Sequence, residues 1–94
     1  MSIDMDSSIE LEKERRKLID AMTEESGPDW EAQYQPGSFG CHELLDRTRL
    51  LADQLEKAVL SHPSCILDPD WYALAWRAVE NLRELYQRVG AAHN

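Results

Sequence analysis

The 94-residue sequence contains only two cysteines, and it has no hydrophobic run long enough to cross a membrane. It also shows no apolar leader of the kind that directs secretion. Small secreted domains are usually rich in disulfides, whereas free thiols are typical of a reducing cytoplasm. We therefore expect a cytoplasmic protein with two free thiols and no binding to membranes.

Basic side chains are outnumbered, because ten lysines and arginines stand against 18 aspartates and glutamates, giving a net charge of −8. Residues 1–34 hold ten acids and four bases, a net charge of −6, and residues 35–94 hold eight acids and six bases, a net charge of −2. The single basic run, residues 13–17, has acids three or four positions away, which is typical of ion pairs on a solvated helix face. An acidic chain repels phosphates, so direct binding to nucleic acid is not expected.

The sequence lacks the motifs of common catalytic and metal sites. It has no glycine-rich phosphate loop, no G-x-S-x-G elbow and no E-x-x-H di-iron spacing. The segment HELLD places Asp46 where the zinc motif H-E-x-x-H needs its second histidine. The remaining histidines and cysteines divide between the two ends of the expected fold, so neither end has four metal ligands. We expect no enzymatic activity, no cofactor and no metal ion.

Cys41 is the one candidate nucleophile, since it lies near an expected helix start and His42 follows it. Neighbouring residues on a helix point about 100° apart, so His42 diverges from Cys41. Cys41 instead shares the helix face of Leu45 and Thr48. We interpret it as a small buried hydrophobic residue.

Residues 68–90, DPDWYALAWRAVENLRELYQRVG, carry the strongest helix signals. Asp68 suits an N-cap, Pro69 suits the first helical position, and Gly90 can end a helix in the left-handed conformation. These signals predict a helix over 69–89. Its main apolar stripe, expected to be core, contains Trp71, Ala75, Ala78, Leu82, Leu85 and Val89. A second stripe, expected to be available to a partner, contains Tyr72, Trp76, Val79 and Tyr86.

A second long helix is expected over 38–61, because Ser38 suits its start and Pro63 disfavours helical geometry just before it. One face of this helix is regularly apolar, and its members are Cys41, Leu44, Leu45, Thr48, Leu51, Ala52, Leu55, Ala58 and Val59. The connection over 62–67 is short, so the two long helices should form an antiparallel hairpin. Cys41 and Cys65 then lie at opposite ends of that hairpin, too far apart for a disulfide.

The N-terminal part is less regular. Ser7 and Glu10 form a capping box that predicts a shorter helix over 8–25, after a mobile tail over 1–7. The apolar stripe of this helix is thin. Residues 26–40 form a linker that contains Trp30, Tyr34 and Phe39, and we expect these aromatics to fill a groove on this chain or on a partner.

Four short runs, PGSFGCHELLDR at 36–47, HP at 62–63, DPDW at 68–71 and LYQRVG at 85–90, occur in this order. In these runs the chain resembles short, uncharacterised bacterial proteins that carry PGSFGCHE, HP, P-x-W and LY-x-x-G. The resemblance covers about the last 60 residues. It implies a bacterial origin and a unit centred on the helical hairpin, and it implies nothing about catalysis.

These features predict one small all-α domain, an antiparallel helical hairpin plus a shorter N-terminal helix, arranged as a three-helix bundle or as a dimeric four-helix bundle. The expected function is that of a non-catalytic protein–protein interaction module, a small acidic subunit that forms a homodimer or docks on a larger protein. The alternative is an acidic inhibitor or neutralising partner of a nucleic-acid enzyme. The candidate partner-binding residues are Tyr72, Trp76, Val79, Tyr86, Trp30 and Tyr34.

Overall fold

The computed structural model describes residues 5–94, and every regular element in that range is a helix, which confirms the all-α prediction. The elements are α1 (Met5–Ser26), η1 (Pro28–Gln33), α2 (Phe39–Leu55), η2 (Glu56–Leu60), α3 (Pro63–Leu67) and α4 (Pro69–His93). The chain divides into two compact units, Met1–Gln33 and Tyr34–Asn94. The first four residues of the predicted tail lie outside the described residues.

In the N-terminal unit, α1 begins at Met5 and not after Ser7, so the predicted capping box is wrong. A capping residue must have a non-helical backbone, whereas Ser7 lies inside the helix. The helix ends at Ser26 because Gly27 adopts a positive φ of 83°, while its amide still donates to the Thr23 carbonyl at 2.9 Å. This is the left-handed C-terminal geometry for which glycine is favoured.

The predicted linker contains a 3₁₀-helix, η1, which the sequence analysis did not anticipate. The indole Nε1–H of Trp30 donates to Thr23 Oγ1 at 2.9 Å, and that hydroxyl donates to the Ile19 carbonyl at 3.0 Å. Both acceptors belong to α1, so Trp30 is an anchor within its own unit. This contact of Trp30 lies within the chain, which is one of the two alternatives expected for the linker aromatics.

The charges of α1 pair along the helix surface as expected. Glu12 accepts hydrogen bonds from Arg15, whose Nε lies 2.9 Å away, and from Arg16 at 3.1 Å. These two hydrogen bonds lower the pKa of Glu12 to about 2. The other two basic residues of the run, Lys13 and Lys17, pair with Glu10 and Glu14. The basic run therefore has its charge neutralised locally.

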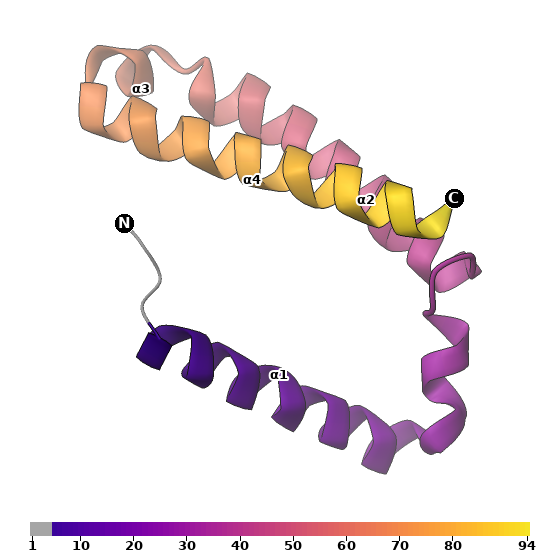
Figure 1. Cartoon of the computed structure of the whole chain (residues 1–94). Helices are drawn as coiled ribbons and strands as arrows, with labels where there is room; N and C mark the ends of the chain where they lie inside the picture. Colours follow the sequence, from indigo (N-terminus) through magenta and orange to yellow (C-terminus); the bar gives the residue numbers. More distant parts are fainter. Residues whose placement is uncertain (1–4) are drawn as a thin grey trace. The chain divides into compact units, whose positions relative to one another are not determined.

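In the second unit, α2 and α4 lie side by side and run in opposite directions, with α3 at the turn between them (Figure 1). This confirms the predicted hairpin. Both predicted N-caps are present, since Ser38 Oγ accepts from the Cys41 amide at 3.1 Å and Asp68 Oδ1 accepts from the Asp70 and Trp71 amides at 2.9 and 3.0 Å. His62 caps α3 in the same way, with Nδ1 accepting from the Ser64 amide.

The predicted end of the last helix at Gly90 is wrong, because α4 continues to His93. Gly90 does not adopt a positive φ, unlike Gly27 and Gly37. A Cβ atom placed on it would lie 3.7 Å from Leu45 Cδ1, which is ordinary van der Waals contact. Gly90 is therefore an interior helix residue where α2 and α4 approach each other, and not a cap.

Gly90→Ala is accordingly expected to stabilise the hairpin by about 0.5–1 kcal/mol, because alanine loses less backbone entropy in a helix interior and its methyl group fits against Leu45. Thermal denaturation followed by circular dichroism measures this effect. The matched control is Gly37→Ala, which must be destabilising because Gly37 has a φ of 90°. A lower melting temperature for Gly90→Ala would support the left-handed cap instead.

The buried side chains of the hairpin are few and mostly small: Cys41, Thr48, Ala52, Leu60, Cys65 and Val79. The most deeply buried are Ala52 and Val79, one from each long helix. Thr48 satisfies its hydroxyl by donating to the Leu44 carbonyl at 2.8 Å. Burial of Cys41 confirms its interpretation as a small hydrophobic residue, and both cysteines are free thiols, as predicted.

The predicted helix over 38–61 is not α-helical throughout, because residues 56–60 form a π-helix, η2. The Ser61 amide donates to the Glu56 carbonyl at 3.0 Å, a bond that spans five residues. A π turn takes up one extra residue and delays the rotation of the residues that follow it. Leu60 is therefore buried, and Val59, predicted to be core, is 43% exposed.

Candidate interaction surface

Two residues of α4 have roles opposite to those predicted for their apolar stripes. Val79, expected on the partner-binding stripe, is 2% exposed and faces α2, whereas Trp71, expected in the core, is 58% exposed. The buried residues of α2, Cys41, Thr48 and Ala52, are small, which allows α4 to approach closely with Val79 buried. Arg83 stabilises this rotation of α4 through ion pairs with Glu56 at 2.7 Å and with Asp53 at 3.5 Å.

This rotation leaves one side of the hairpin covered with apolar side chains. We define the open apolar face as Leu44, Leu51, Leu55, Ala58, Val59, Trp71, Leu74, Ala75, Ala78, Leu82 and Leu85, all of which are exposed or half-buried. Their spacing of three or four residues places them on one side of each helix. Their exposed area is on the order of 600 Å², which matches the largest patches that soluble monomers expose.

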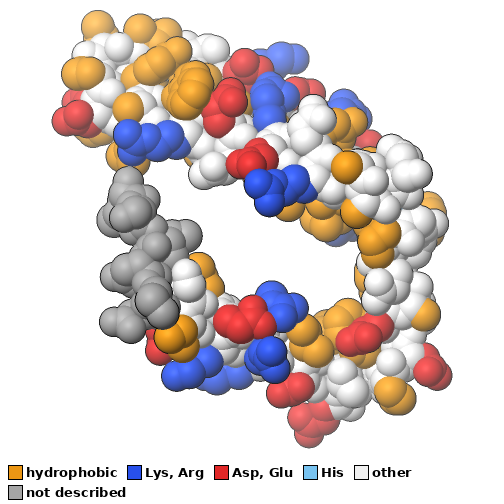
Figure 2. Space-filling model, viewed as in Figure 1, with side chains coloured by type: hydrophobic (Ala, Val, Ile, Leu, Met, Phe, Trp, Pro, Cys, Tyr) orange, Lys and Arg blue, Asp and Glu red, His pale blue; other side chains and the backbone are white. Residues whose placement is uncertain are grey.

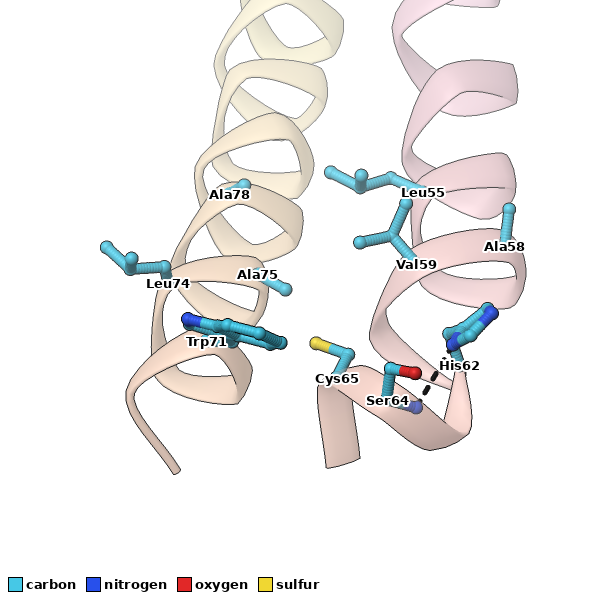
Figure 3. A pocket seen from close by; sticks show the side chains of 10 residues that line it. All are labelled: Leu55, Ala58, Val59, His62, Ser64, Cys65, Trp71, Leu74, Ala75 and Ala78. Carbon is cyan, nitrogen blue, oxygen red and sulfur yellow. Dashed lines mark hydrogen bonds between the residues drawn. The ribbon is translucent and has the colours of Figure 1, made fainter. Parts of the chain in front are cut away.

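The open apolar face contains a hollow of about 590 Å³ at the end of the hairpin where α3 lies. Figure 3 shows its walls: Leu55 and Val59 project from one helix, and Trp71 and Ala75 project from the other. Cys65 closes the end of the hollow, with its sulfur directed at the Trp71 ring. Three alanines, Ala58, Ala75 and Ala78, make the hollow wide, because each leaves space that a larger side chain would fill. In Figure 2 hydrophobic side chains gather at this same end.

The opposite side of the hairpin is polar. Arg49, Arg83 and Gln87 line a small depression there together with Ala52 and Tyr86, and Arg49 pairs with Asp46 at 3.3 Å. Oppositely charged side chains lie next to one another along the visible part of the hairpin in Figure 2. The hairpin therefore has one apolar and one charged side.

The candidate partner-binding residues do not form one site in the structure. Tyr72 and Trp76 are exposed at the edge of the charged side, and Tyr86 is half-buried. Val79 is inaccessible. Trp30 belongs to the N-terminal unit and Tyr34, which is half-exposed, belongs to the hairpin unit.

Sequence reasoning missed Leu74 as a surface residue. It belongs to neither predicted stripe, yet it is the most exposed leucine of the open apolar face. The available signal was its spacing of three from Trp71 and four from Ala78, which extends the main stripe outward.

The ends of α2 and α4 away from α3 bring two histidines together. The rings of His42 and His93 lie 5.6 Å apart between centroids, and the Gly37 amide donates to His93 Nδ1 at 2.8 Å. This bond attaches the segment before α2 to the end of α4. Among residues 5–94, no group of three or more histidine, cysteine or acidic side chains has the arrangement of a metal site. No helix within the same range has both the length and the apolar character needed to cross a membrane.

The chain matches no protein-family model, no curated protein and no solved structure. Its own geometry is therefore the basis for a functional proposal.

Proposed function

We propose that the protein is a non-catalytic protein–protein interaction module that acts through the open apolar face of its hairpin. The supporting observation is the face itself, which combines half-exposed leucines with a broad apolar hollow. Contiguous apolar patches of this size on soluble proteins usually mark interaction sites. A helical surface on the partner would match it, because ridges on one pair of helices pack into grooves on another.

The partner is most simply a second copy of the chain. Closed two-fold pairing is the commonest way in which soluble proteins bury an exposed face. Two hairpins paired in this way form a four-helix bundle, in which core residues come from facing helices. The charged sides, with their Arg83–Glu56 pair, would then remain in water, where exposed ion pairs are well solvated.

Light scattering of the purified full chain tests this proposal, with adjacent leucines as a matched pair. Leu50 and Leu51 are 51% and 54% exposed, but only Leu51 belongs to the open apolar face. The wild-type chain and Leu50→Asp are expected at twice the chain mass of 10.8 kDa, and Leu51→Asp at the single mass. An aspartate in an apolar interface must lose its hydration without gaining a partner. A wild-type monomer, or a dimer that survives Leu51→Asp, would reject this surface.

A second candidate function is that of an acidic partner of a basic protein, such as an inhibitor of a nucleic-acid enzyme. The favouring observation is that residues 18–33 contain five acids and no base, whereas the bases of residues 13–17 are all paired with glutamates. A one-signed acidic segment of this kind can steer a basic surface toward it. Such a complex must weaken steeply as salt concentration rises, whereas an apolar dimer must not.

A further inference from the structure

We propose that the open apolar face binds a second copy turned end for end, so that a leucine ridge of each copy fills the hollow of the other. This inference rests on the proposed function and adds the arrangement of the two copies. We define the leucine ridge as Leu44, Leu51 and Leu85, which stand on the open apolar face outside the hollow.

The leucine ridge and the hollow occupy opposite halves of one face. Two contacts fix how the helices align: Gly90 lies beside Leu45, and Arg83 reaches Asp53 and Glu56. Given a rise of about 1.5 Å per residue, this alignment brings Leu85 to about the level of Leu51, on the side of the hollow away from α3. The hollow begins at Leu55 and Ala78 and extends toward α3. The face is thus raised at one end and recessed at the other.

A two-fold axis that lies parallel to such a face and at right angles to the helices brings two copies face to face and exchanges their ends. If the axis passes near the middle, between Leu51 and Leu55, the Leu85 side chain of one copy meets the alanines of the hollow in the other copy. The same contact occurs twice, as an isologous interface requires. Close packing at such an interface needs space on one copy and side chains that fill it on the other. The three alanines leave that space, and the leucines fill it.

The alternative alignment, with the two α3 ends together, would place hollow against hollow and ridge against ridge. It would leave a void at one end and prevent close approach at the other, and voids of this kind forfeit packing energy. Burying both open apolar faces removes on the order of 1,200 Å² from water, the lower limit for stable interfaces. The end-for-end arrangement is the one that uses this whole area.

The N-terminal helix α1 is a poorer occupant of the face. Its apolar residues Leu11 and Leu18 are separated by a turn that carries Glu14 and Arg15. Glu14 pairs with Lys17 on the surface of α1. A helix with an interrupted stripe cannot present a continuous ridge to a hollow lined by alanine, valine and leucine.

Exchange of side-chain size between the ridge and the hollow tests the arrangement. Leu85→Ala removes the ridge, and Ala78→Leu fills the hollow, so each is expected to weaken dimerisation at least about tenfold. The double variant Leu85→Ala/Ala78→Leu is expected to recover affinity to within about threefold of wild type, because the large and small side chains have exchanged places across the interface. Sedimentation equilibrium gives the dissociation constants, and circular dichroism checks that each variant remains helical.

The matched control is Leu50→Ala, which is expected to leave the dissociation constant unchanged because Leu50 lies outside the open apolar face. If the effects of Leu85→Ala and Ala78→Leu add instead of cancelling, while Leu51→Asp still gives monomers, the arrangement is wrong and the interaction surface stands. If Leu51→Asp leaves the dimer intact, the surface fails as well. A wild-type monomer, in which α1 of the same chain covers the face, would overturn the second copy as the occupant.

Discussion

Val79→Asp is expected to unfold the hairpin. Val79 is 2% exposed, so an aspartate there loses its hydration, and Arg83, one turn later on α4, is already paired with Asp53 and Glu56. The cost of an uncompensated buried charge is several kcal/mol. The free energy of unfolding of a small domain is about 0.1 kcal/mol per residue, so its total is of a size similar to this cost. Far-UV circular dichroism at 25 °C should therefore show loss of most of the helical signal from α2 and α4.

Asn81→Asp is the matched control, because it introduces the same charge on the same helix at an exposed side chain outside the open apolar face. This variant is expected to keep the helical signal and a melting temperature close to that of wild type. If Val79→Asp also melts like wild type while Trp71→Asp unfolds the protein, then α4 is rotated as the sequence alone suggested and the open apolar face is misassigned.

The sequence was sufficient to predict elements whose ends depend on local chemistry. Asp68 with Pro69, and Ser38 before α2, carry their capping groups within a few residues, and the structure contains both caps. The hairpin follows from two long apolar faces and a short connection, which leave few other arrangements. The all-α class and the antiparallel pairing were therefore predictable.

The rotation of α4 was not predictable, because its apolar residues cover about 200° and either half can face α2. Two features outside that stripe decide the rotation. The buried side chains of α2 are small, which favours burial of Val79 against this helix. Arg83 forms ion pairs with Asp53 and Glu56 at the same rotation. For this reason Val79, assigned to the partner-binding stripe, is buried, and Trp71, assigned to the core, is exposed.

The end of α4 was mispredicted for a different reason. A glycine near the end of a helix is compatible with a left-handed cap and equally with a close contact between helices. Gly90 lies beside Leu45, which favours the close contact over the cap. Leu45 is 45 residues away in the sequence, so the local sequence does not reveal this contact. The π turn in residues 56–60 similarly has no signature in the local sequence, and Leu60 within it is buried.

Deletion of a single residue should be damaging before Ala52 and tolerated after it. Removing Arg49, an exposed residue of α2, rotates everything before it by about 100° relative to Ala52, which turns Cys41 and Thr48 out of the seam. The hairpin is then expected to lose its cooperative unfolding transition. Thermal denaturation followed by circular dichroism measures the loss.

Removing Lys57 is expected to be tolerated, because η2 already holds one residue more than an α-helix needs. The shortened helix can become regular while Leu60 remains buried in the seam, so its melting temperature should stay within about 5 °C of wild type, a free-energy change of about 1 kcal/mol. Lys57 is exposed, and its loss breaks no buried contact. A deletion of Lys57 as damaging as that of Arg49 would mean that the π turn is required by its neighbours, and is not an inserted residue that the helix absorbs.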